Sequence, residues 1–168
     1  GTFTASDYSI TYNNGSLTVN PASLSITAND RSKTYGQTLT LGTTQFTSSG
    51  LQNSETIGSV TIAASGGTAA TDTATTYTLT PSAATGGTFT ASNYSITYNT
   101  GTLTVNKAVI TVTAANQTVN TGTAASTVTG NGSVNYTGFQ NSETSSVITG
   151  SVTYTTTYTS SDAAGTAG

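Results

Sequence analysis

The chain repeats itself over a long distance. Its first 20 residues, GTFTASDYSITYNNGSLTVN, return from Gly87 as GTFTASNYSITYNTGTLTVN, an offset of 86 residues with differences at three positions. A repeat of this length usually corresponds to one small domain per copy, arranged in an array. The repeat therefore favours small successive modules over one large domain with a single active site.

Alternating side chains predict strands through most of the chain. Residues 8–12 and 16–20 flank Asn13-Asn14-Gly15, and the later copy places 94–98 and 102–106 around Asn99-Thr100-Gly101. A turn of this type between two alternating runs predicts a β-hairpin. No stretch shows the spacing of an amphipathic helix. Further strands are predicted at 23–28, 38–41, 59–63, 75–80, 109–114 and 151–157.

These patterns predict an all-β fold. The expected architecture is a tandem series of small Ig-like β-sandwich modules with about seven strands each. A series of β-grasp-like modules is the alternative, and a helix crossing one sheet would identify it.

The repeat also predicts where modules begin and end. Residues 21–106 form a complete β module, and residues 107–168 form an incomplete second module that stops near Thr166–Gly168, before the counterparts of 77–80 and 87–106. Residues 1–20 then represent the C-terminal hairpin of a preceding module, or a donor segment. Matching positions drift from an offset of 86 to 88 at Gly50 and Gly138, as expected for loop insertions on a strand scaffold.

This division leaves two interpretations open. The chain is a window on a longer tandem array, or residues 1–20 of one subunit complete the sheet of residues 107–168 in its neighbour by strand addition. Both predict head-to-tail self-association that does not close into a ring, and hence a filament. The side chains expected to contact the neighbouring subunit are Tyr8, Ile10, Tyr12, Leu17 and Val19.

The composition argues against several functions. Only 5% of residues are charged, with three Lys or Arg against six Asp or Glu, so no basic patch supports binding to nucleic acid. No apolar run approaches the length of a membrane span. The chain has no His and no Cys, which removes the common nucleophile–base arrangements. We expect no enzyme activity and no cofactor.

Carboxylates give no better candidate for chemistry. Glu55 and Glu143 lie in the matching segments GLQNSET and GFQNSET, but in different modules, so we expect them to form loop hydrogen bonds. A Ca²⁺ loop needs several clustered oxygen ligands. The nearest approach is Asn29-Asp30, whose counterpart is Ala115-Asn116, so no metal site is predicted.

Glycans are the remaining candidate partners. Tyr8, Tyr12, Tyr94 and Tyr98 recur at alternate positions, which favours half-buried core, with a carbohydrate-binding face as the alternative. Five asparagines also fit the N-glycosylation acceptor pattern, namely Asn14, Asn93, Asn116, Asn131 and Asn135.

Several motifs resemble one family. Leu24-Ser25-Ile26-Thr27-Ala28, Ser32-Lys33-Thr34-Tyr35-Gly36 and the Tyr94–Tyr98 run ending in Gly101-Thr102-Leu103-Thr104-Val105 are similar to the MBG or YDG repeat domains of large bacterial surface adhesins and filamentous-haemagglutinin-like proteins. The resemblance covers 21–106. The second copy departs from it, with Val119-Asn120-Thr121-Gly122 in place of Lys33-Thr34-Tyr35-Gly36.

The resemblance implies a β-rich module at the bacterial cell surface with structural or adhesive work and no activity. Together with the repeat, it predicts a structural repeat of an extracellular filament or a long adhesin stalk. Head-to-tail assembly, with strand complementation between subunits as one mode, is expected. A carbohydrate- or host-surface-binding adhesin module is the alternative.

Overall fold

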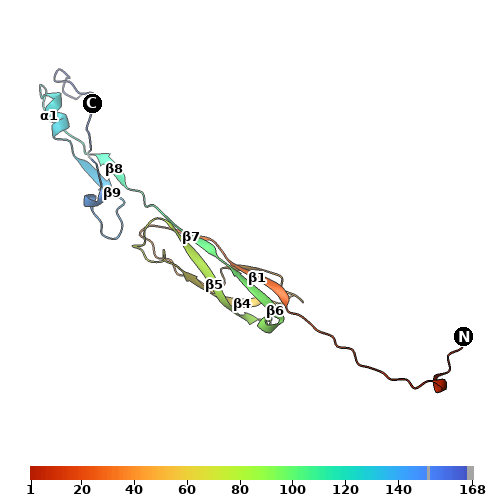
Figure 1. Cartoon of the computed structure of the whole chain (residues 1–168). Helices are drawn as coiled ribbons and strands as arrows, with labels where there is room; N and C mark the ends of the chain where they lie inside the picture. Colours follow the sequence, from red (N-terminus) through yellow and green to blue (C-terminus); the bar gives the residue numbers. More distant parts are fainter. Residues whose placement is uncertain (151, 166–168) are drawn as a thin grey trace.

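The chain folds into an elongated molecule with one well-packed region. The computed structural model describes residues 1–150 and 152–165. A β-sandwich occupies the centre, an extended N-terminal segment leaves one end of it, and a smaller C-terminal unit lies beyond the other end (Figure 1).

The sandwich consists of two sheets. One sheet has the order β3-β1-β6 and the other the order β2-β7-β5-β4. Residues 22–106 contain no α-helix, so the β-grasp alternative is wrong, while the prediction of an all-β sandwich with seven strands is confirmed. The strands are β1 (Ala22–Ala28), β2 (Arg31–Thr34), β3 (Phe46–Ser49), β4 (Ile57–Ala64), β5 (Thr76–Gly87), β6 (Tyr94–Asn99) and β7 (Gly101–Asn106).

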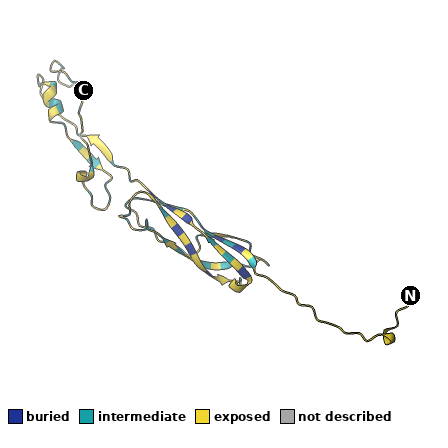
Figure 2. Cartoon of the chain, in the orientation of Figure 1, coloured by how far each residue is buried: buried dark blue, intermediate teal, exposed yellow. Residues whose placement is uncertain are grey.

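The core lies between the two sheets. Alternate residues of the strands point inward, so buried and exposed positions follow each other along the ribbon (Figure 2). This is the burial pattern expected when one face of each sheet packs against the other. Two clusters fill the interior: Leu24, Ile26, Val60, Ala84 and Tyr94 in one, and Ala28, Leu79 and Leu103 in the other.

The last two strands do not form the predicted hairpin. β6 pairs in parallel with β1 in the first sheet, whereas β7 pairs in parallel with β2 and antiparallel with β5 in the second sheet. The short connection at residue 100 therefore carries the chain from one sheet to the other. The chain also changes sheet between β1 and β2, next to this connection. The parallel pair β1–β6 in one sheet is therefore followed by the parallel pair β2–β7 in the other.

Gly101 makes this crossing possible. A Cβ at this position would lie 2.4 Å from the carbonyl oxygen of Ala28, where β1 ends. The Oδ1 of Asp30 accepts a hydrogen bond of 2.7 Å from the backbone N–H of Thr102 and joins the two crossing chains. A glycine inside a strand often marks such a close backbone approach.

The C-terminal unit repeats the start of the sandwich. β8 (Thr111–Ala114) pairs with β9 (Val134–Thr137) in the register that joins β1 and β3, since Val112 lies opposite Tyr136 as Ile26 lies opposite Ser48. A short helix, α1 (Ala125–Gly130), lies between them, so the expectation that no helix forms is wrong here. The strand predicted from 109 begins at 111.

Several other predicted strands are absent. The N-terminal segment contains one 3₁₀ turn, η1 (Ala5–Asp7), and no strand at 8–12 or 16–20. The 38–41 segment is not a strand either, although the backbone N–H of Leu39 donates to the carbonyl of Thr68. Residues 152–157 contain no strand, and Ser151 and Thr166–Gly168 lie outside the described residues.

The remaining helical elements are single turns, η2 (Ala91–Asn93) and η3 (Ser145–Val147). Across residues 1–150 and 152–165, no helix combines the length and hydrophobicity needed to cross a bilayer.

Candidate assembly site

The N-terminal segment carries large apolar side chains that are exposed. Residues 8–20, here called the donor segment, repeat the sequence of 94–106, which forms β6 and β7. Leu17 is 90% exposed whereas its counterpart Leu103 is 0% exposed, and Tyr8 is 64% exposed whereas Tyr94 is 7% exposed. The same side chains are thus core residues in one copy and surface residues in the other.

The C-terminal unit has the complementary feature. Among residues 1–150 and 152–165, β8 pairs only with β9, so the edge that β1 offers to β6 has no strand partner in β8. Val112 is 48% exposed, although its counterpart Ile26 is fully buried. We call β8 and the following residues 115–120 the acceptor edge. An unpaired strand edge presents a row of backbone donors and acceptors to a further strand.

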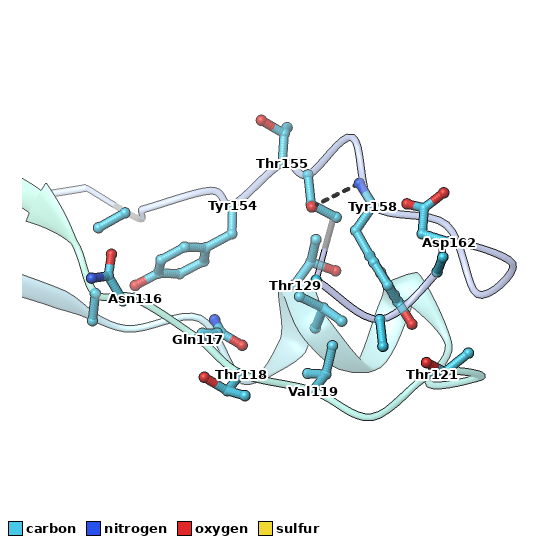
Figure 3. Close-up of a pocket in the computed structure, with 17 residues that line it drawn as sticks. Asn116, Gln117, Thr118, Val119, Thr121, Thr129, Tyr154, Thr155, Tyr158 and Asp162 are labelled. Carbon is cyan, nitrogen blue, oxygen red and sulfur yellow. Dashed lines mark hydrogen bonds between the residues drawn. The ribbon is translucent and has the colours of Figure 1, made fainter. Parts of the chain in front are cut away.

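A cavity of about 630 Å³ lies beside the acceptor edge. One side is lined by residues 114–119 and Thr121, and α1 contributes Val128 and Thr129. The other side is lined by residues 154–156, Tyr158 and residues 162–165, and the Tyr154 and Tyr158 side chains extend from it towards the first (Figure 3). Asp162 is also in the lining, and hydrogen bonds from the Thr159 backbone and hydroxyl lower the pKa of its carboxyl. In the sandwich, β7 and β5 fill the space between β2 and β4.

The loop Gly50–Thr56 binds the start of β6 within the sandwich. The Tyr94 hydroxyl donates to the Glu55 carboxylate and accepts a hydrogen bond of 2.9 Å from the backbone N–H of Gln52. The hydrogen bond to Glu55 raises the pKa of Tyr94, because a phenolate beside a carboxylate is unfavourable.

The matching loop of the C-terminal unit binds a different tyrosine. The Tyr35 hydroxyl, in the turn after β2, donates to Glu143 Oε1 over 2.6 Å. This hydrogen bond raises the pKa of Tyr35. Both glutamates thus form loop hydrogen bonds, as the sequence predicts, but with tyrosines from opposite ends of the sandwich.

These two pairs predict a loss of stability at high pH. In the unfolded chain tyrosine titrates near pH 10, at about its ordinary value. The folded-state pKa of Tyr94 is raised above this value. The contribution of Tyr94 to the free energy of unfolding is therefore fully present below about pH 10, and it is lost as the pH rises through the raised pKa. Urea unfolding midpoints measured on either side of this pH should fall at the higher pH. The fall should shrink in Tyr94→Phe, and an equal fall in both proteins would contradict the assignment.

Lys33 has a structural role. It is 6% exposed, and its Nζ donates to the backbone carbonyls of Gln37, over 2.8 Å, and of Ala69. These bonds tie the turn after β2 to the loop that precedes β5. In the second copy Val119 stands at this position and is 38% exposed.

The other sequence candidates lie in separate places. Tyr94 and Tyr98 are buried and half-buried, and the Tyr98 hydroxyl accepts a hydrogen bond from the Ala84 N–H, whereas Tyr8 and Tyr12 are exposed. In the described part of the chain no three or more His, Cys, Asp or Glu side chains are grouped so as to hold a metal ion. The predicted glycosylation acceptors are all exposed, namely Asn14, Asn93, Asn116, Asn131 and Asn135.

The contact between Tyr35 and Glu143 does not follow from the sequence. The two residues are far apart in the chain, and neither motif by itself indicates the other. The signal available was the recurrence of the loop, since both glutamates follow the same Gln-Asn-Ser segment. That recurrence indicated a common local structure but not its partner.

The two packed sheets define a β-sandwich domain. Residues 24–104 match the family model of the MBG domain (YGX type), so the sandwich is similar to an MBG-type repeat domain. No curated protein and no solved structure matches the chain. MBG domains are generally found in extracellular surface proteins, and the match suggests, at a coarse level, an adhesin-like extracellular repeat.

Proposed function

We propose that the chain is a non-catalytic structural repeat of an extracellular filament or long adhesin stalk, assembled head to tail. Residues 8–20 of one copy complete the unit that starts at residue 107 of the preceding copy. The same pairing joins successive modules when they belong to one polypeptide. The observation that carries the proposal is the contrast between Leu103, fully buried in β7, and Leu17, 90% exposed in the donor segment.

The sandwich supplies the register of this assembly. β1 pairs with β6 so that Leu24 lies opposite Ile96, and β2 pairs with β7 so that Lys33 lies opposite Val105. Shifting both pairings by the repeat offset places Ile110 opposite Ile10. The expected pairs for the second strand are Gln117 with Leu17 and Val119 with Val19.

Backbone and side chains both favour this pairing. The acceptor edge would gain a parallel strand on its unpaired side, and the apolar side chains of the donor segment would leave water. Burying a leucine side chain contributes roughly 1.5–3 kcal/mol. The cavity of about 630 Å³ beside residues 114–121 offers room for part of this segment. The low content of charged residues, 5%, limits repulsion between copies.

Sedimentation velocity on a concentration series tests the proposal. The unmodified chain should form larger species as concentration rises, and electron microscopy should show linear particles. Leu17→Asp should weaken association at least about tenfold, because the buried carboxylate would have no partner. Ser16→Asp is the matched control, since it adds the same charge at a position whose counterpart Thr102 is exposed. A chain that stays monomeric throughout would overturn the proposal.

Carbohydrate binding is the second candidate function. Tyr8 and Tyr12 are exposed on the donor segment, and exposed aromatic rings are suited to stacking on sugars. Binding to a glycan array that is lost in Tyr12→Ala but kept in Leu17→Asp would favour this function over assembly. If neither Tyr12→Ala nor Leu17→Asp binds a glycan on the array, assembly remains the proposed role of the donor segment.

A further inference from the structure

A second contact surface joins the sandwich to the C-terminal unit. On the sandwich side it consists of the turn Tyr35–Gly36 and the backbone of Ala70. On the other side it consists of the loop 138–144. Besides the bond from Tyr35 to Glu143, the Asn141 Nδ2 donates to the Ala70 carbonyl over 3.1 Å.

Gly36 lets the loop approach closely. A Cβ at this glycine would lie 2.3 Å from the Oε1 of Gln140, so a larger residue would displace the Gln140 side chain from its place against the turn. Its φ of +92° also belongs to the region that favours glycine. The tyrosine and the glycine of the turn therefore contribute to the same contact.

The loop has the same backbone conformation in both copies. Asn141 and Ser142 have φ values of 51° and 62°, and Asn53 and Ser54 in the first copy have 52° and 57°. The Glu143 N–H donates to the Gln140 carbonyl over 2.8 Å, as Glu55 does to Gln52 over 2.9 Å. Two copies in different surroundings share one conformation, so the loop presents its side chains in a fixed arrangement.

The glutamate of the loop can accept hydrogen bonds from two different tyrosines. In the first copy a Glu55 oxygen accepts from Tyr94 of the same sandwich. In the second copy Oε1 of Glu143 accepts from Tyr35 of the preceding module. A carboxylate has two acceptor oxygens, so one glutamate can accept from both kinds of tyrosine.

We propose that the Tyr35–Gly36 turn is a docking site for the Gln-Asn-Ser-Glu loop of the module that follows it. The hydroxyl at position 35 holds two successive modules in a fixed alignment, and the residue at this position decides whether a joint is held. This goes beyond the assembly proposed above, because both partners lie in one chain.

The second copy of the turn illustrates the rule. Thr121 and Gly122 stand where the first copy has Tyr35 and Gly36, and Gly122 keeps a positive φ of 89°. The glycine is retained but the long aromatic donor is not. A module following the second unit would meet a turn that lacks the tyrosine hydroxyl, and its joint would be looser.

Distance measurements between spin labels test this joint. The chain has no native cysteine, so labels can be placed at Ser48→Cys on β3 and Ser133→Cys before β9, both exposed. Samples are kept at a concentration where sedimentation shows monomers. Tyr35→Phe removes one hydroxyl, and Tyr35→Thr installs the residue of the second copy. Both should broaden the distance distribution, with about a tenfold fall in the docked-to-undocked ratio.

The matched control is Tyr94→Phe. It removes the same type of tyrosine–glutamate bond inside the sandwich, so it should lower the unfolding midpoint without broadening the distribution between the labels. Distributions of equal width in the unmodified chain and in Tyr35→Phe would overturn the proposal. Broadening by Tyr94→Phe as great as by Tyr35→Phe would also overturn it, because the effect would then not be specific to the joint.

Discussion

Replacing Leu103 with alanine is expected to destabilise the sandwich by about 2–5 kcal/mol, whereas the same change at Leu17 should cost less than about 0.5 kcal/mol in the monomer. Leu103 is fully buried in β7 and packs with Ala28 and Leu79 between the sheets. Its truncation removes apolar contacts and leaves a cavity that the surrounding strands only partly fill. Leu17 is 90% exposed and has no such contacts to lose.

Comparing Leu103→Ala with Leu17→Ala separates the effect of the local sequence on stability from the effect of the surrounding structure. Both leucines stand in the same local sequence, so any difference in their effects comes from what surrounds them. Urea denaturation of dilute protein, followed by circular dichroism, measures both changes in the free energy of unfolding. Equal losses would mean that the donor segment is packed in the monomer. Under assembling conditions the Leu17→Ala chain should become less associated than the unmodified chain.

The second large effect is expected at the point where β6 passes into β7. Gly101→Ala should destabilise the sandwich by about 1–3 kcal/mol, because the new Cβ would lie 2.4 Å from the Ala28 carbonyl oxygen. The obstacle is backbone rather than a flexible side chain, so two strand pairs must separate to accommodate it. The hydrogen bond from the Thr102 N–H to Asp30 would be strained at the same time.

Gly15 is the matched control for this prediction. It occupies the position of Gly101 in the donor segment, and a Cβ there would meet nothing within 4 Å. Gly15→Ala should therefore leave the unfolding midpoint of the monomer unchanged within error. A destabilised Gly15→Ala, or an unaffected Gly101→Ala, would show that the crossing does not depend on this close approach. In the proposed assembly, Gly15→Ala should weaken association, because its Cβ would meet the counterpart of Ala28.

The strands of the first module followed well from the sequence. Alternation predicted β1, β4, the start of β5, β6 and β7, because half-buried strands must place apolar residues on one face. The path between β6 and β7 did not follow. In β6 the inward-facing positions end at Tyr98, and in β7 they resume at Gly101, which is one residue out of strict alternation. A two-residue hairpin and a change of sheet both produce this shift, so the alternation of side chains fits either path.

The candidate site was predictable only in part. The sequence predicts Tyr8, Leu17 and Val19 as contact residues, and this stays a prediction. All three side chains are exposed, although their counterparts in β6 and β7 are buried. The strand conformation expected for them is absent, because a strand needs a neighbour to satisfy its backbone groups. The contact between Tyr35 and Glu143 involves residues distant in sequence and left no local signal.

The sequence by itself determined the conformation of the short turns of this protein. The turns η1 and η2, from nearly identical sequences, adopt the same conformation in solvent and against the sandwich, and the Asn-Ser turns of both loops share positive φ values. Only the tertiary structure decided whether a copy of the repeat is core or surface. Backbone pairing and burial need a partner from elsewhere in the fold, so 94–106 form two strands in two sheets while 8–20 remain exposed.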